Sequence, residues 1–273
     1  MIDSVNLTAG IHQVLQSQQR TAALSDITTE NLATARKVQS PLDSPTAFYQ
    51  ARNLSNRASD LLAVKDTIGQ SLHTIEGASN GLASLNQTIE QIRSITSGAR
   101  GADAAERQVA AQLFDRVAQQ LDSISADASY AGVSLTSAAA QNLEVAINEN
   151  GETLLVSGAA SDRSGLGIGS AVTDFNNLAT DADIDAALAQ LSAATASIRS
   201  REQSFGTDVS ILNVREQFTE ELSNTLQAGA DNLVAADLEE EAANLLALQV
   251  RQKIGNVSLN LINEKNNAIA DLF

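Results

Sequence analysis

The residues that could carry acid–base or metal chemistry are few and widely spaced. His12 and His73 are the two histidines, and neither lies in a His-Glu-x-x-His zinc motif. The acidic run Glu239 to Glu241 places three successive carboxylates around a helix, where they point in different directions and share no pocket. Cysteine is absent, which excludes a thiolate site and a disulfide framework. We therefore expect no catalytic residue, no metal and no cofactor, and the sequence does not support an enzyme.

Two short motifs resemble ligand sites only in part. The spacing of Gly165, Gly167 and Gly169 lacks the third glycine of the dinucleotide-binding pattern Gly-x-Gly-x-x-Gly, so we expect a plain loop. Asp181, Asp183 and Asp185 are spaced like the start of a calcium loop, but alanine and serine stand where that loop needs its glycine and its final glutamate. Acidic residues at the start of a helix explain them better.

The composition excludes two classes of partner. The 273 residues include 33 acidic and 17 basic side chains, and the net charge of −16 disfavours nucleic-acid binding. No run of about 18 apolar residues is present, so we expect no membrane insertion. The residues after Met1 lack the basic and apolar regions of a secretory signal peptide. These rules alone favour the cytoplasm.

Apolar residues repeat every seven positions in two long segments, a pattern that predicts coiled-coil-like helices. The first helix is expected from about residue 46 to 97, behind a hinge that holds Pro41 and Pro45. The second opens at Thr180, with Asp183 three residues on as in a capping box. The long-helix core predicted from these repeats is Leu54, Leu61, Ile68, Ile75, Leu82 and Ile89 in one helix and Ile184, Leu191, Ile198, Phe205 and Leu212 in the other.

A third helix and a hairpin are expected between the long helices. Val109, Leu113, Val117, Leu121 and Ile124 mark one face of a helix that folds back antiparallel and stops near residue 130. The segment 143–147 then alternates apolar and polar residues, the pair at 150–151 is Asn-Gly, and 153–156 can return as a second strand.

Both chain ends predict amphipathic helices that have no partner in their own neighbourhood. If the long helices are antiparallel, the terminal helices meet and pair, and some apolar surface remains for copies of the chain. The predicted polymerisation residues are Leu7, Ile11, Val14, Leu24, Ile27, Leu238, Leu245, Leu246, Val250, Ile254, Val257 and Leu261. The predicted fold is mainly α: an elongated antiparallel coiled-coil-like rod with one small β-hairpin and the termini paired at one end.

Two segments resemble the bacterial flagellins. Residues 128–135 read Ala-Ser-Tyr-Ala-Gly-Val-Ser-Leu, which is similar to the family's aromatic-x-Gly-Val-x-Leu turn at a helix end. Residues 232–255 read Asn-Leu-Val-Ala-Ala-Asp-Leu-Glu-Glu-Glu-Ala-Ala-Asn-Leu-Leu-Ala-Leu-Gln-Val-Arg-Gln-Lys-Ile-Gly, which resembles the family's C-terminal signature ending in Gln-x-x-Gly. About twenty residues separate the hairpin from the last long helix, so the resemblance is to a short flagellin without outer domains.

The resemblance implies a filament subunit for swimming motility that self-polymerises. Its inner terminal-helix domain would comprise residues 1–45 and 230–273, and its long-helix domain with the hairpin residues 46–229. It also implies export without a cleaved signal peptide through the flagellar type III apparatus, which replaces the cytoplasmic expectation with an extracellular filament. The implied partners are copies of the chain, an export chaperone and the export apparatus, and the hook-associated junction and cap proteins.

Two alternatives to the filament subunit stay open. A hook–filament junction protein shares the terminal-helix plan, and a soluble helical-bundle adaptor would also show seven-residue repeats. A host immune receptor recognises an Arg-x-Arg-Glu-Leu run in many flagellins; here the candidate patch reads Gln91, Ile, Arg93, Ser, Ile95. Because one arginine and the glutamate are replaced, the resemblance implies weak receptor activation.

Overall fold

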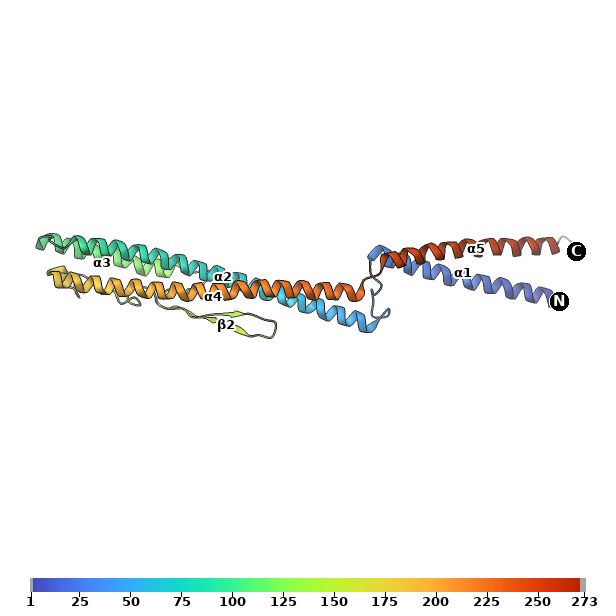
Figure 1. Cartoon of the computed structure of the whole chain (residues 1–273), viewed down its shortest axis with the longest axis horizontal. Helices are drawn as coiled ribbons and strands as arrows, with labels where there is room; N and C mark the ends of the chain where they lie inside the picture. The colour runs from blue at the N-terminus through green and yellow to red at the C-terminus, as the bar shows by residue number, and fades with distance from the viewer. Residues whose placement is uncertain (1, 271–273) are drawn as a thin grey trace. The chain divides into compact units, whose positions relative to one another are not determined.

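The computed structural model describes residues 2–270, which form five long α-helices, a β-hairpin and one short 3-10 helix. The helices are α1 (Ile2–Thr34), α2 (Pro45–Gly98), α3 (Ala104–Asp127), α4 (Asp181–Val234) and α5 (Leu238–Ala270) (Figure 1). Strands β1 (Leu143–Ala146) and β2 (Thr153–Val156) precede the 3-10 helix η1 (Asn176–Leu178). The predicted mainly α fold with a single hairpin is therefore confirmed over the described residues.

The chain divides into two compact units. Unit 1 comprises Met1–Asn56 and Leu226–Phe273, and unit 2 comprises Arg57–Thr225. The boundaries between the units fall inside α2 and α4, so each of these helices contributes residues to both units. Each helix has 54 residues and is about 80 Å long at 1.5 Å per residue. The predicted division into an inner and a long-helix domain, at residues 45/46 and 229/230, stays a prediction.

In unit 2, α2 and α4 lie side by side and antiparallel. The Ser223 hydroxyl donates to the carbonyl of Ala58 at 2.9 Å, and Lys65 pairs with Glu220 at 2.9 Å, which raises the pKa of the lysine. Farther along α2, Arg93 donates to Ser192 on α4. The core of the unit consists mainly of aliphatic side chains from the two helices, α3, the hairpin and the following loop, together with three buried phenylalanines.

The face that α3 buries differs from the expected one. Val109 and Leu113 are exposed, whereas Phe114 is completely buried. The buried positions of α3 are Ala111, Phe114, Ala118, Leu121 and Ser125. The prediction for Val109 and Leu113 was wrong because small residues can line a helix interface, and the large Phe114 sets the face. The helix also ends at Asp127, three residues before the expected position.

The hairpin has the register that its alternation predicts. Leu143 pairs with Val156 and Ala146 with Thr153, and Val145 and Val156 are completely buried. Gly151 has φ +84° in the turn, a conformation that glycine adopts without strain.

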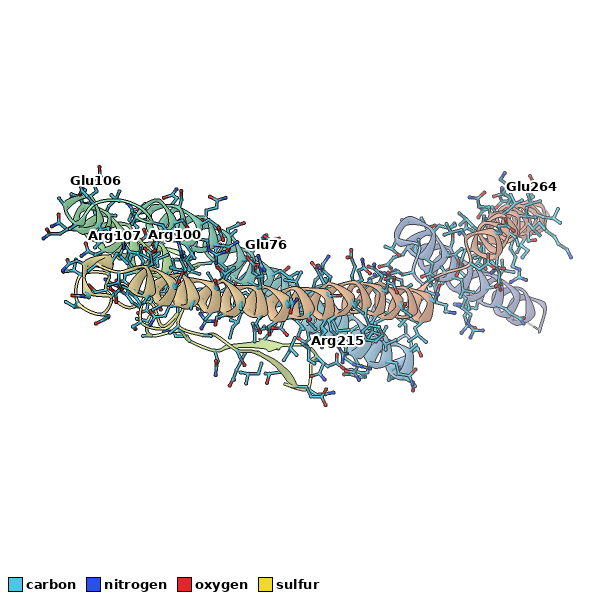
Figure 2. The ribbon with its side chains drawn as sticks, turned by 60° about the vertical axis from the view of Figure 1, so that its left-hand side comes forward. Glu76, Arg100, Glu106, Arg107, Arg215 and Glu264 are labelled. Carbon is cyan, nitrogen blue, oxygen red and sulfur yellow. The ribbon has the colours of Figure 1, made fainter. Side chains whose placement is uncertain are left out.

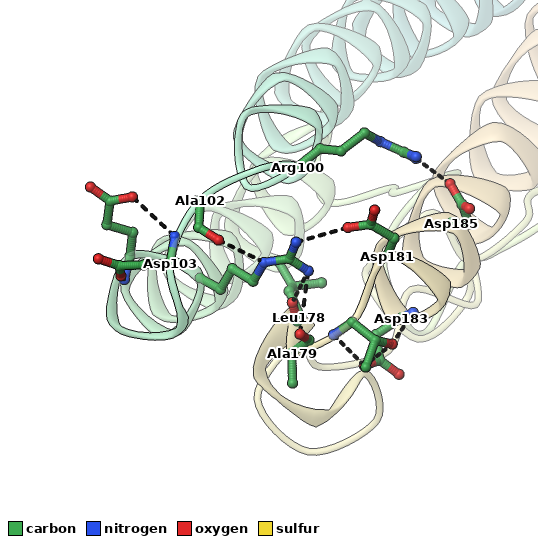
Figure 3. A network of polar contacts seen from close by, with 11 residues as sticks. Arg100, Ala102, Asp103, Leu178, Ala179, Asp181, Asp183 and Asp185 are labelled. Carbon is green, nitrogen blue, oxygen red and sulfur yellow. Dashed lines mark hydrogen bonds and ion pairs between the residues drawn. The ribbon is translucent and has the colours of Figure 1, made fainter.

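Arg107, labelled in Figure 2, joins the starts of α3 and α4 to the loop between them, and Figure 3 shows this network with the partners Ala102, Leu178, Ala179 and Asp181 labelled. Its side chain is 13% exposed, and its guanidinium donates to the carbonyls of Ala102, Leu178 and Ala179 and, at 2.8 Å, to the carboxylate of Asp181. All three residues of η1 have positive φ, which is costly for a buried Leu178. Arg107 therefore fixes a strained turn at the beginning of α4.

The expected capping box of α4 is present at the same place. Thr180 N donates to the Asp183 carboxylate at 2.9 Å, and Asp183 N donates to the Thr180 hydroxyl at 3.2 Å. This reciprocal pair satisfies donors that a helix start leaves free, so Asp183 caps α4, while Asp181 and Asp185 pair with Arg107 and Arg100.

Candidate functional site

The terminal helices α1 and α5 pair antiparallel in unit 1 (Figure 1). Most half-buried and buried positions of α1 and α5 are spaced three and four residues apart, as in a coiled-coil seam. The positions with this spacing are Ile11, Val14, Gln18, Thr21, Ser25, Thr28 and Leu32 in α1 and Glu241, Leu245, Leu248, Gln252, Gly255, Leu259 and Ile262 in α5, while Gly10, Asn31 and Ser258 are half-buried outside it. This seam carries many polar and small residues.

The larger apolar surface of α5 faces away from the seam. Its members are 49–66% exposed and recur three or four residues apart, so at 3.6 residues per turn they form one stripe on the face roughly opposite the seam. We call these residues the α5 stripe: Leu246, Val250, Ile254, Val257 and Leu261. Together with Ala243, Ala247 and Arg251, the first three line a shallow groove.

The predicted polymerisation residues thus separate into two sets. Ile11, Val14 and Leu245 lie in the seam. The exposed ones are Leu24, Ile27 and Leu238 and the five residues of the α5 stripe. Leu7 lies outside the residues whose side chains are described. Their role in polymerisation stays a prediction.

A small core lies next to this helix pair in unit 1. Val38, Ala51, Ala230 and Val234 are buried together, with the half-buried Leu54 against them. Lys37 N donates to the carbonyl of Val234 at 2.8 Å, and Ala236 N donates to that of Ala35 at 3.0 Å. These contacts fix the chain where it leaves α1 and enters α5.

The other predicted core residues of the long helices lie in unit 2, and all of them are buried: Leu61, Ile68, Ile75, Leu82, Ile89, Ile184, Leu191, Ile198, Phe205 and Leu212. In the candidate receptor patch, Gln91 is exposed, while Arg93 and Ile95 are half-buried. Arg93 is engaged within the chain, because it donates to Ser192 at 3.3 Å and lies 3.9 Å from Glu90.

The described residues contain no group of three or more His, Cys, Asp or Glu side chains that could hold a metal ion. His12 and His73 are both exposed on helices, and His73 contacts Glu76 at 3.2 Å. Within the same part of the chain, no helix is long and apolar enough to cross a membrane.

Sequence reasoning missed a second apolar group, on α4. Ile211, Val214 and Phe218 are 41–63% exposed, at spacings of three and four residues that form one outward face. A search for seven-residue repeats passes over them because the neighbouring Leu212 and Thr219 occupy the repeat and are buried. The signal available was the i, i+3, i+7 spacing beside the repeat.

Curated relatives match this chain along its whole length. Flagellin FljO of Caulobacter vibrioides is 24% identical over 274 residues, covering 100% of this chain and 99% of that protein. The flagellin of Brucella melitensis is 23% identical over 267 residues, covering 95% of each. The solved Bacillus cereus flagellin has a TM-score of 0.49 and 15% identity, covering 56% of this chain and 88% of that one. No protein-family model matches.

The fold and the α5 stripe define a helical protein whose paired terminal helices present an unpartnered apolar face. This chain is similar to bacterial flagellins from end to end, so the resemblance predicted from the sequence is confirmed.

Proposed function

We propose that this chain is a structural subunit that self-polymerises into the extracellular filament of the bacterial flagellum, for swimming motility. The observation that supports this function best is the α5 stripe, an apolar face left open in a chain whose full-length relatives are flagellins. A hook–filament junction protein or a helical-bundle adaptor is not favoured, because the full-length relatives reported above are named flagellins.

In this proposal, polymerisation buries the faces that a single chain cannot bury. The seam between α1 and α5 contains buried threonines at positions 21 and 28, so the pair gains little from the hydrophobic effect by itself. Neighbouring copies that cover the α5 stripe and the exposed Leu24 and Ile27 supply the missing burial. Ordering of the terminal helices and addition of a subunit are then thermodynamically linked.

The finer parts of the proposal follow from the resemblance. Residues 1–45 and 230–273 form the inner layer of the filament and residues 46–229 the surrounding layer. The chain leaves the cell through the flagellar type III apparatus without a cleaved signal peptide, and an export chaperone covers α5 before export. Junction and cap proteins lie at the two ends of the filament. Catalysis is not part of the function. Activation of the host receptor is weak, since Arg93 already bonds within the chain.

Assembly of the purified chain tests the function. Short flagellin seeds or a precipitating salt, which strengthens apolar burial, are added, and the product is followed by sedimentation and negative-stain microscopy. Long uniform filaments that dissociate on heating are the expected result. Seeds that fail to elongate, or short closed rings, would remove the filament function and favour the junction protein or a bundle.

A further inference from the structure

Gly255 occupies an unusual place in the middle of α5, inside the seam with α1. Glycine weakens a helix interior relative to alanine, and here no positive φ requires it. The same glycine ends the Gln-x-x-Gly signature of residues 252–255. Another constraint must therefore favour the absence of a side chain at this position.

The side chain of Gln18 on α1 fills the space above Gly255. Its Nε2 donates to the backbone carbonyl of Gln252 at 3.0 Å, a contact between residues 234 positions apart. A Cβ added to Gly255 would overlap the Gln18 amide and come within 3.2 Å of its Cγ. Glycine thus lets a side chain of one helix reach the backbone of the other.

The remaining seam positions repeat every seven residues, so α1 could slide along α5 by one repeat and still meet a seam. In the observed register Gln18 faces Gly255; after a slide it would face Leu248 or Ile262, where a bulky side chain fills the space. The half-buried Gln18 amide would then lose its carbonyl partner, which costs part of that hydrogen bond's free energy. Asn31 adds a second polar contact in the same register, donating to Glu241 at 2.9 Å.

We propose that Gln18 and Gly255 form a register lock that sets the alignment of α1 against α5. Polar residues in a coiled-coil seam can specify register at some cost in stability, and this pair does so through one side chain and one missing side chain. The lock fixes the level of the exposed Leu24 and Ile27 relative to the α5 stripe. Its effect on polymerisation rests on the proposed function, whereas the alignment of the two helices does not.

A double-mutant cycle in the full chain tests the lock. Amide hydrogen exchange of α1 and α5 peptides is compared in the unsubstituted chain, Gly255→Ala, Gln18→Ala and the double variant, in monomer and in assembled material. We expect Gly255→Ala alone to speed exchange about five-fold, because the Gln18 amide is displaced. Together with Gln18→Ala, the same change should slow exchange by up to about five-fold through alanine's better helix propensity.

Gly206→Ala in α4 is the matched control, because a Cβ at Gly206 meets open space. It should slow exchange locally, whatever residue occupies position 18. The lock would be overturned if Gly255→Ala slowed amide exchange both with Gln18 present and with Gln18→Ala, so that the two substitutions were additive. It would also be overturned if the amides of α1 and α5 showed no protection from exchange in either the monomer or the filament. If Gly255→Ala speeds exchange with Gln18 present and slows it with Gln18→Ala, but no filament forms, the proposed function is refuted and the lock is not.

Register is read directly with single disulfides, since the chain has no cysteine of its own. The pair Asn31→Cys with Glu241→Cys should oxidise in the observed alignment, and Leu24→Cys with Glu241→Cys only after a slide of seven residues. We expect the second pair to oxidise several-fold more in a Gln18→Leu background, in which Leu248 becomes an acceptable neighbour. Equal yields with and without Gln18→Leu would contradict the lock.

Discussion

Replacement of Ile254 by aspartate tests the α5 stripe most sharply. Ile254 is 61% exposed, so contact with another copy can bury at most about three-fifths of it. Complete burial of an isoleucine is worth about 1.5–3 kcal/mol, which leaves about 1–2 kcal/mol for the contact. A carboxylate enclosed without a partner adds further cost, so we expect Ile254→Asp to lose at least about 3 kcal/mol of assembly free energy.

The assay is the critical concentration for polymerisation, measured by sedimentation of seeded samples. A loss of 3 kcal/mol corresponds to a rise of more than about 100-fold, because 1.4 kcal/mol is a factor of ten. Ile254→Ala removes only the apolar contact and should raise the critical concentration by about five- to thirty-fold. The order of the two variants therefore separates lost burial from buried charge.

Asn256→Asp is the matched control for added charge. Asn256 is an exposed residue of the same helix, and at 3.6 residues per turn it lies away from the α5 stripe. We expect its critical concentration to stay within about three-fold of the unsubstituted chain. Normal polymerisation of Ile254→Asp, with circular dichroism showing intact helices in all variants, would refute the assignment of this face.

Three further predictions concern the fold. Arg107→Met should lower the free energy of unfolding by about 3 kcal/mol in denaturant titration, because four acceptors lose a largely buried partner. The control Arg100→Met breaks the exposed pair with Asp185 and should cost under about 1 kcal/mol. Equal losses in the two variants would contradict the role of Arg107. Gly81→Ala should destabilise the chain by about 1–3 kcal/mol in the same titration, because the new Cβ overlaps that of Ala128, and a gain in stability would show that the helices separate freely. Backbone donors at Ser40 and Gln39 hold the pKa of Asp43 below its ordinary value of 3.8. The ionised carboxylate therefore stabilises the turn above pH 3.8, and this stabilisation is lost as the pH falls through the lowered pKa. The amide NMR shifts of residues 39 and 40 should report this titration, and Asp43→Asn should abolish it.

Elements governed by local chemistry were predictable from the sequence. The hairpin follows from alternation around an Asn-Gly turn, and the start of α4 follows from Thr180 and Asp183, since both signals lie within a few residues. The strained turn that Arg107 fixes left no local signal, because the turn residues that Arg107 contacts are more than 70 positions away from it in the chain.

The division of the terminal helices into a seam and an open face was not predictable from hydrophobicity alone. Apolar spacing identified Leu246 and Ile254 as members of an amphipathic helix and indicated that some apolar surface would stay uncovered, but it did not indicate which face would meet α1. The structure places Thr21, Thr28 and Gly255 in the seam and leaves the α5 stripe open. Which face pairs depends on a partner more than 200 residues distant, as with Gln18 and Gln252.

Electron cryomicroscopy of the assembled filament tests the central claim most directly. The proposal predicts that Leu246, Val250, Ile254, Val257 and Leu261 are enclosed by neighbouring copies, while the seam between α1 and α5 stays within one chain. A filament in which these five side chains face solvent, or assembled material without a repeating lattice, would contradict it.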